Sequence, residues 1–94
     1  MLIEWSILAR ADLKEAVAYI QRDDHATAQI VAQKIINATQ KLVDFPGLGR
    51  PGRVEGTREL IVSNLPYVLP YVVEKERVVI LRVLHSAMDW PSHH

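Results

Sequence analysis

A chain of 94 residues is long enough for one domain, because a domain of this size buries about 60–65% of the surface that its unfolded chain exposes. Its 11 basic and 11 acidic side chains give no net charge, which excludes a general positive field that would attract nucleic acid. The absence of cysteine excludes disulfides and thiolate metal sites. We therefore expect a single domain over residues 1–94.

Nothing near the start of the chain suggests secretion or membrane insertion. Glu4 interrupts the first apolar residues, so no secretory signal is expected. Pro70 breaks the apolar run 68–73, which is far shorter than a membrane span. We expect a cytoplasmic protein that makes no contact with a membrane.

The first elements are a short strand and a helix. Residues 2–5 alternate as a strand would, and Ser6 can cap the helix that follows. Apolar residues at helical spacing predict an amphipathic helix over residues 7–22. We interpret its charged residues, Asp12 among them, as a solvated face.

A second helix begins at the acidic pair Asp23 and Asp24, which can cap it. Its apolar residues recur at spacings of three and four from Ala28 to Phe45, and Pro46 ends the pattern. Because the connection is short, the two helices are expected to form an antiparallel hairpin.

The loop after this hairpin holds a cluster of basic residues: Arg50, Arg53 and Arg58. Residues 47–52 match the letters G-x-G-x-x-G, but they follow a helix and not a strand, so we interpret them as a turn-rich loop and not as a dinucleotide site. The arginines form either a contact surface or an ordinary solvated loop.

Three strands are predicted at residues 57–62, 67–74 and 78–84, and short turns join them into an antiparallel meander. Pro70 lies in the second strand and cannot donate a hydrogen bond, so a bulge or a missing bond is expected there. The predicted fold class is α+β: an N-terminal strand, an antiparallel helical hairpin and a three-stranded antiparallel meander, forming one sheet with the helices on one face.

Two polar residues stand out at the end of the chain, Arg82 among apolar neighbours and His85 just after them. A charge in such a run is costly without a partner, so Arg82 should contact a polar group or extend its head to water. His85 either works as an acid or base or bonds the backbone at a strand end. No metal-ligand spacing or catalytic triad accompanies them, and we expect no metal and no cofactor.

The order of these elements, with GLGRPGRVEGTREL before the sheet and LPYVLPYVVE and ILRVLHSAMDW within it, resembles the RelE/ParE superfamily of toxins from bacterial type II toxin–antitoxin modules. The resemblance covers essentially the whole chain. It implies a small α+β toxin that a cognate antitoxin holds inactive in a hetero-oligomer.

Members of this superfamily differ in their target. Resemblance to RelE-like members implies a metal-independent, ribosome-dependent mRNA endonuclease, with Arg58 and Arg82 on the phosphate and His85 as general acid. Resemblance to ParE-like members implies inhibition of DNA gyrase. The ending RVLHSAMDW, the arginines where RelE-like enzymes carry lysines, and the net charge of zero favour the ParE type.

Under the ParE-like interpretation, several residues are candidates for contacting the target or the antitoxin: Arg50, Arg53, Arg58, Arg82 and Trp90. Trp90 and four apolar residues of the helices, Ile7, Leu8, Ile30 and Ile36, lie off the inferred seams. They either complete the core or lie under an antitoxin segment whose acidic side chains reach Arg50, Arg53 or Arg82.

Overall fold

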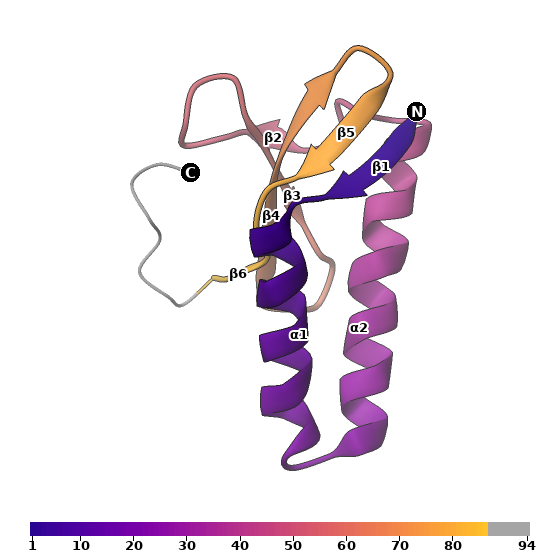
Figure 1. Cartoon of the computed structure of the whole chain (residues 1–94), viewed down its shortest axis with the longest axis vertical. Coiled ribbons are helices and arrows are strands. Elements are labelled where there is room, and N and C mark those ends of the chain that lie inside the picture. Colours follow the sequence, from indigo (N-terminus) through magenta and orange to yellow (C-terminus); the bar gives the residue numbers. More distant parts are fainter. Residues whose placement is uncertain (87–94) are drawn as a thin grey trace.

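The computed structural model describes residues 1–86 (Figure 1). Its elements follow one another as β1 (Leu2–Trp5), α1 (Ile7–Gln21), α2 (His25–Gln40), the 3-10 turn η1 (Lys41–Val43), β2 (Arg50–Pro51), β3 (Arg58–Ile61), β4 (Tyr67–Glu74), β5 (Arg77–Ile80) and β6 (Leu84–His85). The predicted α+β class is confirmed. No helix in this part of the chain is long and apolar enough to cross a membrane.

All strands belong to one sheet, in which the order is β1-β5-β4-β3-β2 and β6 pairs with β4. The predicted meander is confirmed, because β3, β4 and β5 pair antiparallel with Glu59 opposite Pro70 and Tyr71 opposite Ile80. Strand β1 runs parallel beside β5 at one edge. Strand β2 at the other edge arises in the loop that was expected to contain only turns, so that expectation was wrong for its two residues.

The helical hairpin packs on one face of this sheet, as predicted. Figure 1 shows α1 and α2 side by side and antiparallel, extending away from the sheet. The core forms where this hairpin meets the sheet, and it includes Ile35 and Leu42 from the hairpin with Leu69, Tyr71 and Ile80 from the strands. Leu69 and Tyr71 of β4, and Val78 and Ile80 of β5, are two residues apart, so their side chains point to the same face of the sheet, toward the hairpin.

Both predicted helix caps are confirmed. The Ser6 hydroxyl accepts from the Ala9 N–H at 3.0 Å, and the Asp24 carboxylate accepts from the Thr27 N–H at 3.1 Å. The second helix ends at Gln40 and tightens into η1, earlier than the sequence pattern indicates. Phe45 is 66% exposed, so its assignment to the apolar seam was wrong: the chain has left helical geometry before it reaches that position.

The segment predicted as one strand over residues 78–84 is two strands with a break. Strand β5 ends at Ile80, opposite Tyr71, and β6 begins at Leu84, opposite Val68. Residues 81–83 therefore face only residues 69–70 of β4, which is the one-residue excess of a β-bulge. The expectation of an irregularity beside Pro70 is confirmed.

Proline chemistry explains where this break falls. The Pro70 carbonyl accepts from the Leu81 N–H at 2.8 Å, but Pro70 has no N–H to return to the Leu81 carbonyl, as a regular antiparallel pair requires. The Ser6 hydroxyl donates to that carbonyl instead, at 2.8 Å. The start of α1 thus completes the backbone pairing that Pro70 leaves open.

Candidate functional site

Arg82 lies in the break between β5 and β6 and turns toward helix α1. Its Nε donates to Asp12 Oδ2 at 2.8 Å and its Nη2 to Asp12 Oδ1 at 3.1 Å, a two-pronged ion pair. The backbone N–H of Val83 donates to Asp12 Oδ2 at 2.9 Å. The prediction that Arg82 contacts a polar group is confirmed. The interpretation of Asp12 as part of a solvated face was wrong.

The environment of this pair fixes the charge of Arg82. Its side chain is 23% exposed and that of Asp12 is 16% exposed, so water screens the pair only in part. The hydrogen bonds to Asp12 raise the pKa of Arg82, which keeps the guanidinium charged and unable to act as a base. No sequence pattern points to Asp12, because it lies 70 residues from its partner.

His85 lies in β6 and packs against an aromatic ring. The centroids of the Tyr67 and His85 rings are 5.5 Å apart, and the ring planes are nearly perpendicular at 81°. Burial raises the pKa of Tyr67. A cavity of about 360 Å³ lies beside them and is also lined by Glu15 and Tyr19 of α1. His85 and Asp12, the partner of Arg82, both line this cavity.

The basic loop is held together from within. Glu59 of β3 is only 3% exposed, and its carboxylate accepts from Arg50 Nε at 3.1 Å and from the Arg53 backbone N–H at 2.9 Å. Arg58 Nη1 donates to the Gly49 carbonyl at 2.8 Å. Two of the predicted contact residues, Arg50 and Arg58, therefore stabilise the loop in which they lie. Glu59 was not singled out in the sequence analysis.

Tyr71 anchors the same loop from below. Its hydroxyl, on a fully buried side chain, donates to the Pro46 carbonyl at 2.7 Å and accepts from the Gly49 N–H at 2.8 Å. A Cβ added to Gly49 would come within 2.8 Å of the Glu59 carbonyl oxygen. The close approach of loop and sheet therefore requires glycine at this position.

Each residue proposed for a nuclease site makes contacts of its own within the fold. Arg58 donates to the Gly49 carbonyl in the loop, and Arg82 forms an ion pair with Asp12 of α1. His85 packs against the ring of Tyr67. Trp90 lies outside the described residues. Among residues 1–86, no three His, Cys, Asp or Glu side chains come together as a metal site would require.

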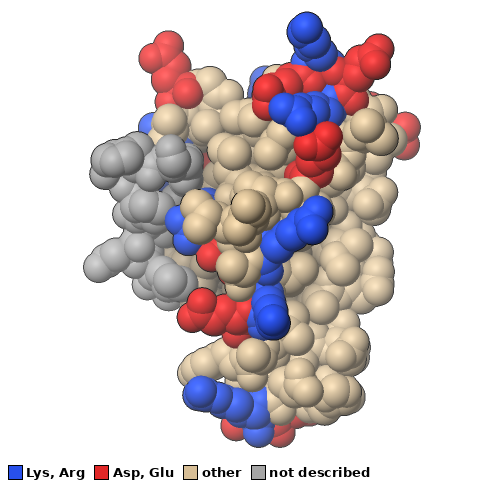
Figure 2. All heavy atoms as spheres, viewed as in Figure 1, with Lys and Arg blue, Asp and Glu red and all other residues tan. Residues whose placement is uncertain are grey.

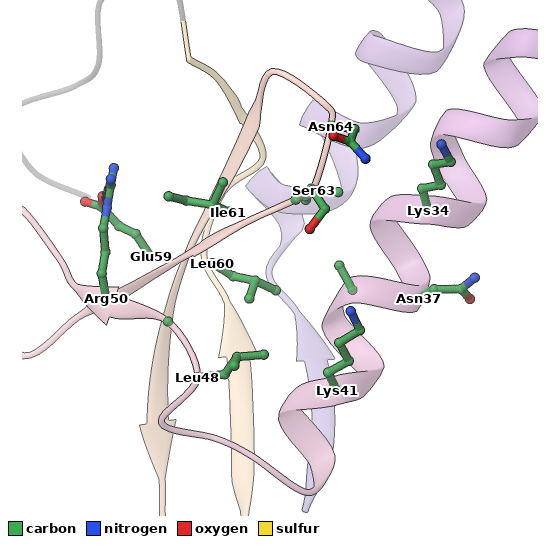
Figure 3. A pocket seen from close by; sticks show the side chains of 13 residues that line it. Lys34, Asn37, Lys41, Leu48, Arg50, Glu59, Leu60, Ile61, Ser63 and Asn64 are labelled. Atoms are coloured by element: carbon green, nitrogen blue, oxygen red, sulfur yellow. Dashed lines mark hydrogen bonds and ion pairs between the residues drawn. The ribbon is translucent and has the colours of Figure 1, made fainter.

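A groove of about 610 Å³ separates α2 from the edge of β3. Figure 3 shows Lys34 and Lys41 on the α2 side of this groove and Ile61 and Ser63 on the β3 side. Strand β2 covers β3 only opposite Arg58 and Glu59. The edge at Ile61 therefore has no strand partner within the described chain and presents backbone donors and acceptors to the groove.

A second groove, of about 600 Å³, lies on the hairpin. It is lined mostly by apolar residues such as Trp5, Leu13, Val17 and Ile36, with Arg10 and Lys14 also in its lining. Figure 2 shows basic side chains over α1 beside a broad surface over α2 that carries almost no charge.

The four apolar residues that the helix pattern leaves outside the core are on the surface. Ile7 is 87% exposed, and the other three, Leu8, Ile30 and Ile36, are exposed as well. These four residues do not complete the core, so this alternative is excluded for them. The hairpin carries apolar surface that its own fold leaves uncovered.

The sheet, the hairpin and the sequence together define a class of protein. Residues 3–90 match the family described as the ParE toxin of the type II toxin–antitoxin system parDE, and the chain belongs to this family. The resemblance to the RelE/ParE superfamily is confirmed, and membership implies a cognate antitoxin as partner.

Two bacterial toxins are similar to this chain in sequence. The chain is 40% identical over 90 residues to toxin Y4kP of Sinorhizobium fredii, covering 96% of this chain and 93% of that protein. It is 34% identical over 85 residues to toxin RelE2 of Caulobacter vibrioides, covering 90% of this chain and 94% of that protein.

Solved structures show the same fold. A chain of the chromosomal ParDE toxin–antitoxin system from P. aeruginosa superimposes with a TM-score of 0.80 at 30% identity, covering 90% of this chain and 95% of that one. The YoeB/ParE toxin from Agrobacterium tumefaciens shares the fold, with a TM-score of 0.64 at 19% identity over 90% of this chain and 98% of that one.

Proposed function

We propose that this chain is a ParE-type toxin that acts in the cytoplasm by binding and inhibiting DNA gyrase, and that it does not cut RNA. One observation carries this choice: the Asp12 carboxylate neutralises the guanidinium of Arg82 through two hydrogen bonds. Phosphodiester cleavage without a metal needs free positive charge where the transition state accumulates negative charge. The similarity to the P. aeruginosa ParDE structure supports the same choice.

Under this proposal, Arg58, Arg82 and His85 are not catalytic residues. Arg82 stabilises the break between β5 and β6, and the basic loop offers Arg50, Arg53 and Arg58 as predicted contacts for gyrase or for the antitoxin. All three residues are exposed, and the side chain of Arg50 is half exposed although it pairs with Glu59. Trp90 remains a predicted contact from the sequence alone.

A gyrase assay tests the proposal directly. The purified chain is added in excess to DNA gyrase, ATP and relaxed plasmid, and we expect loss of supercoiling or accumulation of cleaved plasmid. Arg82→Gln should retain this inhibition, because Arg82 is paired with Asp12 and is not among the contacts proposed for gyrase. Normal supercoiling without cleaved DNA would contradict gyrase as the target.

Because one relative is named toxin RelE2, the same preparation should also be added to a translation reaction programmed with a defined mRNA. We expect the message to stay intact. Cuts positioned at codons, abolished by Arg82→Ala without loss of thermal stability, would replace the proposal with the endonuclease alternative.

We further infer that the cognate antitoxin covers both grooves. Beside α2, an extended acidic segment can pair with the open edge of β3 at Ile61, where Lys34 and Lys41 favour its carboxylates. On the hairpin, an amphipathic helix can cover the apolar lining around Ile36. Toxin and antitoxin then form a hetero-oligomer in which both kinds of exposed surface are buried.

Hydrogen exchange with and without the antitoxin tests this inference. We expect new protection at residues 60–63 and on the hairpin, and we expect Lys34→Glu with Lys41→Glu to weaken the complex by about tenfold or more. Lys75→Glu, in the turn between β4 and β5, is the matched control and should change little. Protection confined to the basic loop would contradict the inferred binding mode.

A further inference from the structure

Three N–H groups converge on one carboxylate at the end of the sheet. Arg82 Nε, Arg82 Nη2 and the Val83 backbone N–H all donate to Asp12, at 2.8, 3.1 and 2.9 Å. The donors come from two consecutive residues in the break between β5 and β6, whereas the carboxylate comes from α1. The donors of Arg82 and Val83 therefore form a cradle at the bulge, and the carboxylate of Asp12 occupies it.

The chemistry of this cradle is that of an anion site. A guanidinium fork with an adjacent backbone N–H matches two oxygens of a carboxylate or a phosphate equally well. The Arg82 side chain is 23% exposed, so its surroundings are open enough for water to reach the pair. A phosphate can bind these donors only if it displaces the Asp12 carboxylate.

We propose that Asp12 is a specificity-determining residue that masks this anion site, so that the end of the sheet does not bind the phosphates of nucleic acid. Because Asp12 is part of the same chain, its carboxylate competes at a high effective concentration with any phosphate in solution. Removing the carboxylate leaves the three donors without their anion and frees one positive charge. This inference goes beyond gyrase inhibition and does not require that gyrase be the target.

The test measures binding of a fluorescein-labelled single-stranded RNA oligonucleotide by anisotropy at low salt. Asp12→Asn keeps a side-chain oxygen for the Val83 N–H but removes the charge, and we expect it to tighten RNA binding by about tenfold and to steepen the salt dependence by roughly one phosphate contact. Adding Arg82→Gln to this variant should abolish the gain.

The matched control is Glu15→Gln, which changes the net charge by the same amount on the same helix. Glu15 lines the neighbouring cavity together with Asp12, but it is not the acceptor for Arg82. Equal RNA affinity of Asp12→Asn and Glu15→Gln would overturn the proposal, because the gain would then be a general charge effect.

A second measurement keeps the test decisive if Asp12→Asn fails to fold. In the otherwise unchanged protein, Arg82→Gln removes one positive charge and frees the Asp12 carboxylate, so it should lower the affinity for RNA no more than Arg77→Gln, which also breaks an arginine–carboxylate pair. A several-fold greater loss of RNA affinity in Arg82→Gln than in Arg77→Gln would show that Arg82 is already accessible to phosphate, and the proposal would be wrong.

Discussion

Three side chains with little exposure to solvent hold irregular backbone in place. Tyr71 fixes residues 46–49, Glu59 fixes the loop at Arg50 and Arg53, and Asp12 fixes the bulge at Arg82 and Val83. Each of them satisfies backbone or charged donors that would otherwise be left unpaired, which is costly inside a protein. The surfaces proposed for binding therefore rest on polar contacts as well as on apolar packing.

Two glycine substitutions test whether close packing requires a glycine at residue 49. Gly49→Ala should destabilise the fold by about 1–3 kcal/mol, because its Cβ would lie 2.7 Å from Tyr71 Cε1 and 2.8 Å from the Glu59 carbonyl oxygen. Gly47→Ala is the matched control, since nothing lies within 4 Å of its added Cβ. Urea unfolding measures both variants, and equal stabilities would contradict the assigned role of Gly49.

At the scale of the elements, the junction of β1 and α1 contacts the segment that follows β5. Ser6 caps α1 by accepting from the Ala9 N–H, and it donates to the Leu81 carbonyl that Pro70 cannot bond. One hydroxyl thus completes a helix end and a sheet ladder. This dual contact explains why the chain tolerates a proline in its central strand.

The coupling between these two residues can be measured. Ser6→Ala should cost about 1–2 kcal/mol of folding stability, through loss of the cap and of the bond to Leu81. In a Pro70→Ala background the cost should fall by about 0.5–1 kcal/mol, because an alanine N–H can donate to the Leu81 carbonyl. Urea unfolding of the four proteins gives the coupling, and an unchanged cost of Ser6→Ala would refute it.

The start of α2 gives the fold a pH dependence. Hydrogen bonds from Thr27, chiefly from its backbone N–H, lower the pKa of Asp24 below its ordinary value of 3.8. Since the folded state holds the proton more weakly than the unfolded state, the cap stabilises fully above about pH 4 and is lost as the pH falls further. Asp24→Asn should show less loss of thermal stability between about pH 5 and pH 3 than the unchanged protein.

Local patterns predicted the parts of the fold that depend on neighbours in sequence. The caps at Ser6 and Asp24, the two helices and the meander all follow from spacing and turn chemistry. The role of Asp12 at residues 82–83 and the bond from Ser6 to Leu81 depend on contacts between segments far apart in the chain. No periodicity records such contacts, so the sequence singled out Arg82 and His85 but not the residues that they contact.

For the whole molecule, the exposed apolar surface of the hairpin is the feature on which the proposed antitoxin contact depends. Ile36 lines the hairpin groove and is partly exposed, whereas Ile7 is 87% exposed and does not line it. Ile36→Ser should change the free energy of unfolding by less than about 1 kcal/mol and weaken the antitoxin complex by about tenfold or more.

Ile7→Ser is the control for this prediction and should leave the affinity for the antitoxin nearly unchanged. Isothermal titration of each variant with the purified antitoxin gives the affinities, and thermal melts give the stabilities. If both variants bind as tightly as the unchanged toxin, the hairpin groove is not part of the interface.

The parallel pairing of β1 with β5 bears on how the protein is made. Leu2 lies opposite Arg77, and the bond from Ser6 to Leu81 spans 75 residues. At roughly 5–20 residues per second, the first strand waits for about 4–15 seconds of synthesis before its neighbour in the sheet exists. During that interval the segments of both helices have been made, but the sheet is not complete. Under the proposed binding mode, an antitoxin already present can reach the hairpin segment before the toxin is fully folded.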